Sequence, residues 1–306
     1  MAIPDFQSLM LPFLLVAADG REHRHADVFE ALRQSLELSD EDLKELLPSG
    51  VQPKFENRVR WAKWYLTRAG LLERTGHGSF RISRRGRDAL AASPARIDVK
   101  YLQQYPEFAE LSKTAGDDAA SDGGDGATNP EETLAATYAG LRAVLARELL
   151  DHLKAGSPQF FERVVVDLLV AMGYGGSRHD AARAVGQVGD GGIDGVIKED
   201  KLGLDVVLLQ AKRWDVPVGR PVVQAFAGSL EGQRARKGVL ITTSSFTKDA
   251  LEYVTLIEKR IVLIGGAELA ELMIDHGVGV AEVEIYRVKR IDEDYFEGAP
   301  VAMVEE

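Results

Sequence analysis

A stretch of 19 residues in the middle of the chain, TAGDDAASDGGDGATNPEE at 114–132, limits the possible architecture most strongly. It is rich in Gly, Ala and Asp, and its apolar residues follow no period. Such a composition buries too little apolar surface to offset the entropy of ordering, and its like charges repel one another. We therefore expect two domains, residues 1–111 and 131–306, joined by an acidic flexible linker over 112–130.

The composition of the chain is that of an ordinary globular protein. Its 306 residues are 45% hydrophobic and 28% charged, and this length is sufficient for two separate cores. The absence of cysteine excludes disulfides and thiolate zinc sites and suits a reducing compartment. The apolar N-terminal stretch has no basic segment before it and is too short to cross a bilayer. We expect a cytoplasmic protein with no membrane partner.

Charge is distributed unevenly along the sequence. The net charge is −11, yet the segment from Lys54 to Arg87 holds ten Lys or Arg residues and two Glu residues. The segment from Ser112 to Glu132 holds one Lys and six acidic residues. The overall negative charge therefore does not exclude a nucleic-acid partner, because the distribution of charge matters more than its sum.

The N-terminal part has the pattern of a winged helix-turn-helix. Apolar periodicity predicts helices over about 6–17, 26–36 and 54–69, and Gly70 is a suitable residue to follow the third helix. The segment ERTGHGSFRIS at 73–83 then places two glycines between short strand-like pieces, which indicates a hairpin. A short helix follows over RRGRDALAA, 84–92. Three helices followed by a basic hairpin are typical of this DNA-binding fold.

The third of these helices has a basic face with interleaved aromatic residues. Its apolar residues recur every three or four positions and should face the core, whereas cations and aromatic rings follow the opposite side. A face of this kind suits the major groove and its phosphates, and the wing adds further cations. The predicted DNA contacts are Lys54, Arg58, Trp61, Tyr65, Arg68, Arg81, Arg84 and Arg85. The alternative is a solvated amphipathic helix whose Trp packs on its neighbours.

After the linker the pattern changes to an alternation of helices and strands. Helices are predicted over about 131–156, 158–173, 218–233, 246–257 and 267–275. Strands are predicted over about 184–188, 193–198, 204–212, 237–244 and 261–265, with a last one over 281–288. This order predicts an α/β domain with a mixed sheet flanked by helices. No glycine-rich phosphate loop opens any of the helices, which argues against a nucleotide-binding fold.

Two of these predicted strands bring three polar groups together. If residues 193–212 form a hairpin centred on Leu202, Asp194 falls opposite Gln210. Because side chains alternate along a strand, Gln210 and Lys212 share a face, and Asp194 joins that face from the partner strand. A shift of the register by one residue would turn Asp194 away. In the GDGG turn, Asp190 is the alternative acidic residue.

An acid, an amide and an ammonium group on one sheet surface suit the hydrolysis of phosphodiester bonds. Carboxylate and amide oxygens bind Mg²⁺, which stabilises charge on the phosphate and lowers the pKa of a bound water. A nearby Lys can orient or deprotonate that water. Because Gln210 is neutral, the site has one negative charge fewer than two carboxylates would give, and Glu162 on the preceding helix could supply it.

The run GDGGIDGVIKEDKLGLDVVLLQAKRW, with FERVVVDLLVAMGYGG before it and VGRPVVQAFAGSL and GVLITTSSFT after it, resembles the Mrr family of restriction proteins. The N-terminal KFENRVRWAKWYLTRAGL followed by a wing resembles the winged-helix domain of that family. The resemblance implies a restriction-endonuclease-like fold of the PD-(D/E)xK superfamily in its D…QxK form. It assigns metal binding to Asp194, Gln210, Glu162 and the carbonyl of Ala211. It also implies a catalytic role for Lys212 and a position facing the site or the DNA for Gln224.

The same resemblance implies a Mg²⁺-dependent endonuclease of the modification-dependent, type IV class, acting on methylated double-stranded DNA. One active site cuts one strand, so we expect a homo-oligomer, a dimer or higher, when both strands are cut. Two alternatives stay open. One is a DNA-binding regulator on a nuclease fold that no longer cuts, and the other is a repair or type II-like nuclease with the same chemistry.

Overall fold

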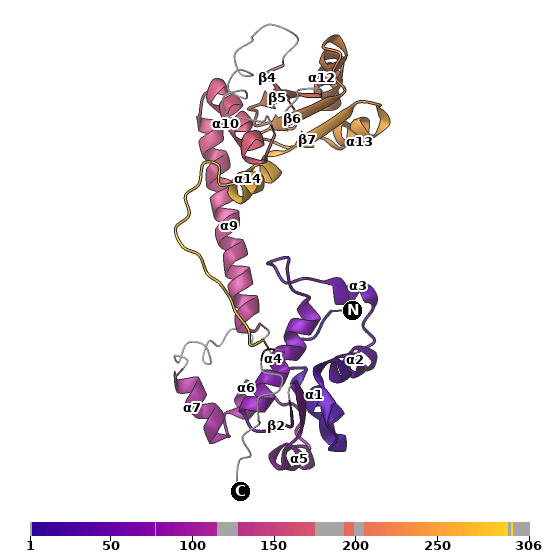
Figure 1. Cartoon of the computed structure of the whole chain (residues 1–306), viewed down its shortest axis with the longest axis vertical. Helices are drawn as coiled ribbons and strands as arrows, with labels where there is room; N and C mark the ends of the chain where they lie inside the picture. Colours follow the sequence, from indigo (N-terminus) through magenta and orange to yellow (C-terminus); the bar gives the residue numbers. More distant parts are fainter. Residues whose placement is uncertain are drawn as a thin grey trace. The chain divides into compact units, whose positions relative to one another are not determined.

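The computed structural model of the chain describes residues 2–76, 78–114, 128–174, 193–198, 205–292 and 295. It divides into two compact units, residues 1–140 with 288–306, and residues 141–287 (Figure 1). The long helix α9 (Pro130–Ala155) contributes residues to both units. Most of the predicted acidic linker, at 115–127, lies outside the described residues, and the domain limits given by the sequence stay a prediction.

The N-terminal unit combines short helices with a small antiparallel sheet whose strand order is β1-β3-β2. Its helices are α1 (Met10–Val16), α2 (His25–Ser35), α3 (Asp40–Lys44), α4 (Lys54–Arg68), α5 (Arg84–Ala91), α6 (Val99–Leu102) and α7 (Pro106–Thr114). Its strands are β1 (His23–Arg24), β2 (Leu72–Arg74) and β3 (Ser79–Ile82). The hairpin β2–β3 after α4 is the predicted wing, and together with the three predicted helices it makes the winged-helix arrangement. The sequence did not predict β1, α3, α6 or α7.

Helix α4 is the central element of this unit. Phe55, Val59, Ala62 and Leu66 are fully buried and form one core with residues of α1, α2, β3 and α5. The helix ends at Arg68, and Gly70 has a φ of +72°, a left-handed conformation that glycine adopts without steric cost. The predicted core face and end of this helix are therefore confirmed.

In its described residues, the C-terminal unit has a four-stranded sheet between two layers of helices. Its helices after α9 are α10 (Pro158–Ala171), α12 (Arg220–Gly232), α13 (Lys248–Leu256) and α14 (Gly266–Asp275). Its strands are β4 (Gly195–Lys198), β5 (Val206–Lys212), β6 (Lys237–Thr242) and β7 (Arg260–Ile264). They follow the order β4-β5-β6-β7, with β4 antiparallel to β5 and the remaining pairs parallel. The predicted mixed sheet is confirmed.

Alternate residues of β5 enter two different cores. Leu209 packs with α9, α10 and α14 on one side of the sheet. Leu208 packs with α12 and α13 on the other side. Because both faces are covered, the strand reads as a continuous apolar run, and polar residues within it lie close to buried surroundings. Gln210 and Lys212 are those residues.

The structure contradicts one further predicted strand and does not describe the residues of another. The strand predicted over 281–288 is wrong: this segment has no regular secondary structure, and Val283 is 96% exposed. Its apolar alternation has no partner strand among the described residues, and a strand without a partner leaves its backbone groups unpaired. The strand predicted over 184–188 lies outside the described residues.

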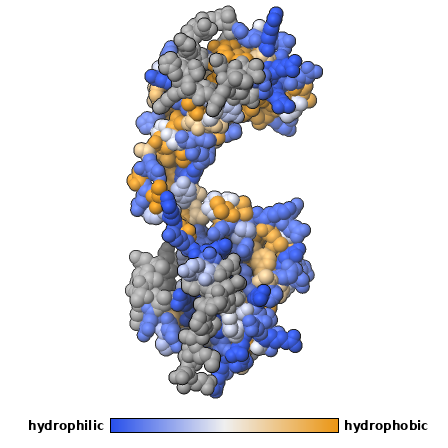
Figure 2. Space-filling model, in the orientation of Figure 1, coloured by the Kyte–Doolittle hydropathy of each residue, from blue (hydrophilic) through white to orange (hydrophobic). Residues whose placement is uncertain are grey.

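The surface is largely hydrophilic on the face in Figure 2, and apolar patches interrupt it along α9. None of the helices that the structure describes is both long enough and apolar enough to span a bilayer.

Candidate active site

The pairing of β4 with β5 places Asp194 beside the end of β5. Gly195 pairs with Leu209 and Val196 with Leu208, and the next step in this register sets Asp194 opposite Gln210. The backbone amide of Asp194 donates to the carbonyl of Leu209 over 2.9 Å. The amide of Ala211 in turn donates to Oδ2 of Asp194 over 2.7 Å. The register predicted from a centre at Leu202 is therefore confirmed.

The end of β5 is fixed by its parallel neighbour β6. The carbonyl oxygen of Lys212 accepts a hydrogen bond from Oγ1 of Thr242 over 2.8 Å and another from the amide of Thr243 over 3.2 Å. Both threonines are buried, which protects these hydrogen bonds from water. Gln210 is 6% exposed and Lys212 is partly buried. The strand therefore holds an amide and an ammonium group two residues apart at a fixed position.

Glu162 reaches the same place from helix α10. The helix is started by Ser157, whose Oγ accepts from the amide of Phe160 over 3.1 Å, and by Pro158 in the first turn. Phe161 and Val165, on either side of Glu162 in the helix, are buried in the core that also contains Leu209 of β5. Glu162 itself is partly buried and interacts electrostatically with Asp194 and Lys212.

Glu162, Asp194 and Lys212 interact electrostatically with one another. Burial raises the pKa of Asp194 above its usual range, against the opposing effects of the Ala211 amide and the Lys212 ammonium. Burial also raises the pKa of Glu162, the negative charge of Asp194 raises it further, and Lys212 lowers it. Two carboxylates in mutual repulsion favour a proton or a cation between them. The local sequence offered little reason to include Glu162 in this site, and in the structure its pKa responds to the charges of Asp194 and Lys212.

The donor set fits a hard divalent cation. It offers two carboxylates, the amide of Gln210 and backbone carbonyls of β5, which are the oxygen ligands that Mg²⁺ prefers. No group of three or more His, Cys, Asp or Glu side chains suited to a metal occurs within the described residues, and Gln210 is neutral. The alternative acid, Asp190, lies outside the described residues.

The structure rearranges the DNA-contacting face predicted for α4. Arg58 is only 7% exposed and is paired with Glu132, so its predicted role as a surface DNA contact is corrected. Lys54 is paired with Glu45 over 2.6 Å. Trp61 and Tyr65 pack against the core with their aromatic rings, as the alternative interpretation proposed for the Trp. Arg68 remains exposed, with its guanidinium 5.6 Å from the ring centre of Trp64.

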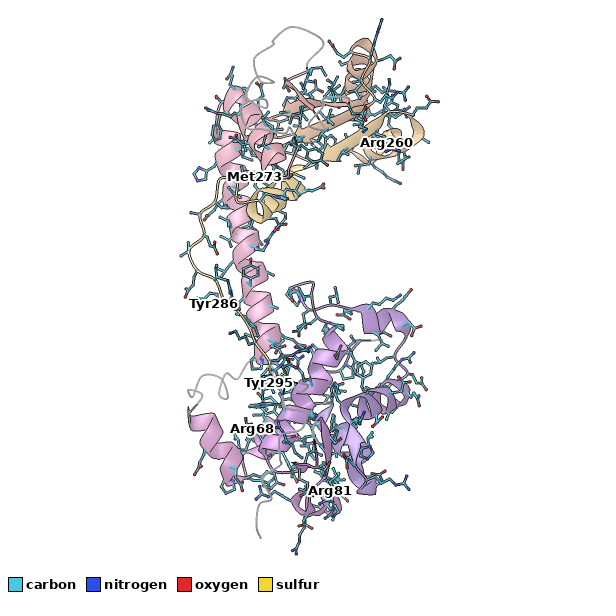
Figure 3. The ribbon with its side chains drawn as sticks, in the orientation of Figure 1. Arg68, Arg81, Arg260, Met273, Tyr286 and Tyr295 are labelled. Carbon is cyan, nitrogen blue, oxygen red and sulfur yellow. The ribbon has the colours of Figure 1, made fainter. Side chains whose placement is uncertain are left out.

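The wing and its neighbours keep part of the predicted cationic surface. Arg81 is exposed and paired with Glu73 on the neighbouring strand of the wing, and Arg84 is exposed at the start of α5. Arg68 on α4 and Arg81 on β3 are labelled in Figure 3. Arg85 is engaged internally, since it donates to the carbonyl of Ala69 and to Glu107, each over 3.0 Å. Gln224 is exposed on α12.

The solvent-facing side of α4 contains residues that the sequence interpretation did not single out. Arg60 and Lys63 are partly exposed there, and Trp64 is 37% exposed. The signal that could have found them is the pair of aromatic residues at 61 and 65. Large rings extend the buried stripe sideways, which turns the polar face of the helix toward positions 60 and 64.

The fold and this site define a class: a restriction endonuclease whose catalytic domain follows a winged-helix domain. A family model described as "Restriction endonuclease" matches residues 153–273, and one described as "Mrr N-terminal domain" matches residues 6–92. The chain is 39% identical, over 97% of its own length and 100% of the relative, to the type IV methyl-directed restriction enzyme EcoKMrr of Escherichia coli K12. It belongs to the Mrr family of restriction endonucleases.

Among solved structures, the restriction endonuclease MspJI in complex with a 27-mer oligonucleotide matches with 26% identity and a TM-score of 0.31. The match covers 43% of this chain and 31% of MspJI, an overlap too limited to inform on the site.

Proposed function

We propose that this endonuclease hydrolyses the phosphodiester backbone of methylated double-stranded DNA with Mg²⁺. The observation that carries the proposal is the convergence of Glu162, Asp194 and Lys212, from α10 and the β4–β5 hairpin, at one end of the sheet. The identity to a methyl-directed relative along nearly the whole chain supports methylated DNA as the substrate.

The residues that would hold the ion are Asp194, Glu162, Gln210 and the backbone carbonyl of Ala211. Bound there, Mg²⁺ supplies positive charge to the phosphate and lowers the pKa of a coordinated water. The hydrogen bond from the Ala211 amide fixes one carboxylate oxygen of Asp194. The other oxygen of that carboxylate can therefore be presented in a defined direction, which reduces the reorganisation needed on binding.

Lys212 acts on the phosphate and the attacking water. Its backbone is fixed by Thr242 and Thr243, so its side chain starts from a defined point beside Asp194. The ammonium group stabilises negative charge that develops on the phosphate oxygens and orients the water by hydrogen bonding. Its positive charge also acts against the burial that raises the pKa values of Glu162 and Asp194, because Lys212 lowers both.

The N-terminal unit supplies affinity for DNA through its exposed cations. The segment from Lys54 to Arg87 carries ten basic and two acidic residues, and Arg68, Arg81 and Arg84 are exposed. Cations of this kind contact phosphates and give binding that weakens as salt rises. Base recognition and recognition of the methyl group require further contacts that these residues do not define.

Cleavage of both strands is proposed to use two copies of the chain. Leu134, Tyr138, Leu141 and Leu145 are exposed on α9 at spacings of four, three and four residues, the spacing of a helix seam. The exposed fractions of these four residues range from 36% to 65%. A second copy of the same helix is a partner that such a stripe fits by symmetry.

A cleavage assay on matched plasmids tests the proposal. The full chain is incubated with methylated and unmethylated forms of one plasmid, with Mg²⁺, with Ca²⁺ and with a chelator. We expect nicked and linear products only from the methylated plasmid with Mg²⁺, and none with the Lys212→Ala variant. Equal cleavage of both plasmids would overturn methylation dependence. Binding without cleavage under all conditions would indicate a DNA-binding regulator instead.

A further inference from the structure

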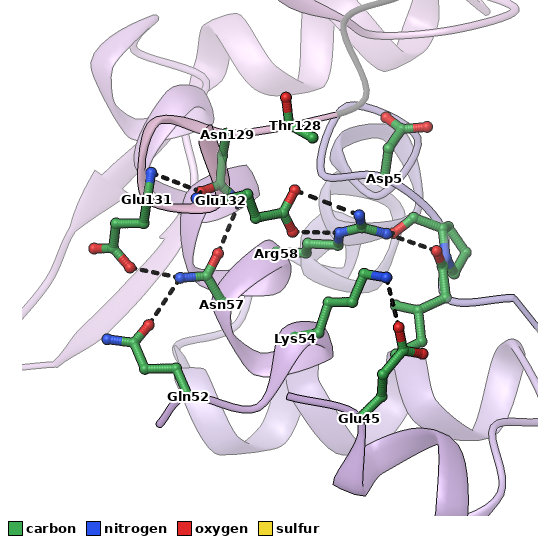
Figure 4. Close-up of polar contacts among 12 residues, drawn as sticks. Asp5, Glu45, Gln52, Lys54, Asn57, Arg58, Thr128, Asn129, Glu131 and Glu132 are labelled. Atoms are coloured by element: carbon green, nitrogen blue, oxygen red, sulfur yellow. Dashed lines mark hydrogen bonds and ion pairs between the residues drawn. The ribbon is translucent and has the colours of Figure 1, made fainter. Parts of the chain in front are cut away.

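The first turn of α9 is fixed against α4 by a polar cluster (Figure 4). Asn129 caps α9, since its Oδ1 accepts from the backbone amides of Glu131 and Glu132, each over 3.1 Å. The side-chain amide of Asn129 also donates to Oδ1 of Asn57 on α4 over 2.7 Å. All of these residues belong to the N-terminal unit. The arrangement brings two carboxylates against two arginines of α4.

These two ion pairs differ in their access to water. Arg58 and Glu132 meet over 2.6 Å with side chains only 9% and 4% exposed, and Arg58 also donates to the carbonyls of Ile3 and Pro4. Arg60 and Glu131 meet over 2.5 Å with side chains 31% and 23% exposed. Breaking the first pair would leave a charge buried, whereas solvent already reaches the second. The pair of Arg60 and Glu131 is therefore the exchangeable one.

The partners of Glu131 form a site for an anionic oxygen. One oxygen, Oε2, accepts from Nη2 of Arg60 and from Nδ2 of Asn57, each over 2.5 Å. Asn57 is only 1% exposed. Oε1 of Gln52 accepts a hydrogen bond from the side-chain amide of Asn57 over 2.9 Å and another from Nη2 of Arg60 over 3.4 Å. Two fixed donors that converge on one oxygen, one of them a guanidinium, suit a phosphate oxygen as well as a carboxylate.

Positive charge surrounds this position on the α2 and α4 side. Burial, with the nearby charges of Lys63 and Arg60, lowers the pKa of His25 at the start of α2 to about 4. Its imidazole is therefore neutral at neutral pH. The ammonium of Lys63 lies 4.7 Å from the ring centre of Phe80 on β3. A polyanion near this surface is attracted to the same groups that Glu131 now neutralises in part.

We propose that Arg60 and Asn57 form a contact site for a DNA backbone phosphate and that Glu131 occupies this site in the free protein. DNA then binds by exchanging the carboxylate for a phosphate, and the affinity is lower than it would be with Arg60 unpaired. Glu132 and Asn129 keep the first turn of α9 in place during the exchange. The inference rests on the proposed function, in which the N-terminal unit contacts DNA.

The competing interpretation gives Glu131 a structural role only, as an acid in the first turn of a helix. The two differ in one measurable respect. If Glu131 competes with phosphate, its removal changes the affinity for DNA, and this change depends on Arg60. If Glu131 is a structural acid, its removal changes the stability and leaves DNA binding unaltered.

The test is a double-mutant cycle on the full chain, with affinities for an unmethylated duplex measured by fluorescence anisotropy. Glu131→Gln keeps an acceptor for Asn57 and should tighten binding about two- to fivefold, as expected for a partly exposed ion pair. Glu41→Gln on α3, exposed and with the same change in net charge, is the matched control and should change affinity less. Arg60→Ala should weaken binding more in the Glu131→Gln background than in the natural chain.

Additive effects of the two substitutions, or equal effects of Glu131→Gln and Glu41→Gln, would overturn the inference. Melting temperatures of all variants report on folding, and if Glu131→Gln is destabilised, Glu131→Ser completes the cycle. Arg68→Ala distinguishes a failure of the exchange at Arg60 from a failure of DNA contact by the N-terminal unit. If Arg68→Ala weakens binding while the cycle is additive, only the exchange at Arg60 fails. If neither Arg68→Ala nor the substitutions of the cycle affect binding, the proposed DNA contact by this unit fails as well.

Discussion

The backbone amide of Ala211 donates a 2.7 Å hydrogen bond to the carboxylate of Asp194, which joins the start of β4 to the end of β5. This hydrogen bond determines where the acid stands relative to the two polar residues on either side of Ala211. It connects Asp194 to a strand whose end is itself fixed by β6. Both hydrogen bonds involve main-chain groups of β5, the amide of Ala211 and the carbonyl of Lys212, so substitution of the Lys212 side chain leaves them in place.

Substitution of Lys212 or Asp194 should therefore remove catalysis without unfolding the protein. Lys212→Ala loses the ammonium that we propose to act on the phosphate and water, and we expect a loss in cleavage rate of about 10²–10⁴-fold. Asp194→Asn keeps an oxygen for the Ala211 amide but removes the negative charge. Cleavage is measured on methylated plasmid, and DNA affinity by anisotropy. A variant that cuts at the natural rate would show that the site is assigned wrongly.

Binding of the divalent cation should weaken as pH falls. The pKa values of Asp194 and Glu162 are raised above their usual ranges, so both acids take up protons at a higher pH than free carboxyl groups do. Protons and the cation compete for the same oxygens. Titration calorimetry with Mg²⁺ or Mn²⁺ at a series of pH values measures this, with Lys212→Ala protein to prevent any reaction. An affinity that stays constant down to the usual pKa of a carboxyl group would contradict the assignment.

The raised pKa values of Asp194 and Glu162 also predict how the stability of the metal-free protein changes with pH. An acid whose pKa is raised in the folded state binds more protons there than in the unfolded chain, so stability falls as pH rises through this window. Asp194→Asn has no carboxyl group to ionise, so the variant avoids this loss of stability. The metal-free variant should melt at a higher temperature than the natural protein at neutral pH, and the difference should close below the ordinary pKa of 3.8. A lower melting temperature at neutral pH would contradict this prediction.

Much of the candidate active site could be predicted because its pattern is local. The hairpin centre at Leu202 follows from two apolar runs separated by KEDKLG, and it fixes the pairing of Asp194 with Gln210. Glu162 could not be predicted from local pattern, since one Glu in a helix is usually at the surface. Only the packing of α10 on β5 brings it to the acid of another segment.

The predicted DNA-contacting face of α4 was wrong at Arg58 because this residue, too, contacts a distant segment of the chain. Arg58 looks like a surface cation in the sequence, but its partner Glu132 lies 74 residues away. Nothing local indicates a contact of that range. The strand predicted over 281–288 failed because alternation of apolar residues specifies a face and does not supply a partner strand.

Removal of one partner from the pair of Arg58 and Glu132 should strongly destabilise the N-terminal unit. Removal of one partner leaves the other charge buried, and we expect Arg58→Ala or Glu132→Ala to destabilise the unit by about 3–5 kcal/mol. The replacement of both by Met and Leu should recover most of that loss. Denaturant unfolding of the full chain, followed by tryptophan fluorescence, measures it. If Arg58→Ala were as stable as the natural protein and bound DNA less well, Arg58 would be a DNA contact after all.

Arg68 should behave in the opposite way from Arg58. It is exposed on α4, so Arg68→Ala should change the stability little and weaken DNA binding. The loss of one phosphate contact reduces the slope of log K against log salt by about 0.9. Lys100→Ala on α6 is the matched control, because Lys100 is exposed and lies outside the predicted DNA contacts. Equal salt slopes for the natural chain and Arg68→Ala would remove Arg68 from the DNA-contacting surface.

The apolar stripe on α9 should hold two copies of the chain together. Leu141 is 65% exposed, and Leu141→Glu places a charge in the middle of the stripe. If α9 pairs with its copy, the variant should have half the mass of the natural protein in light scattering. Nicked plasmid should also accumulate relative to linear product, because single copies cut one strand at a time. Leu251→Glu on α13, where the leucine is 48% exposed, introduces the same charge elsewhere and should leave the mass unchanged. A natural chain that stays monomeric on DNA while cutting both strands together would show that double-strand cleavage does not use this helix.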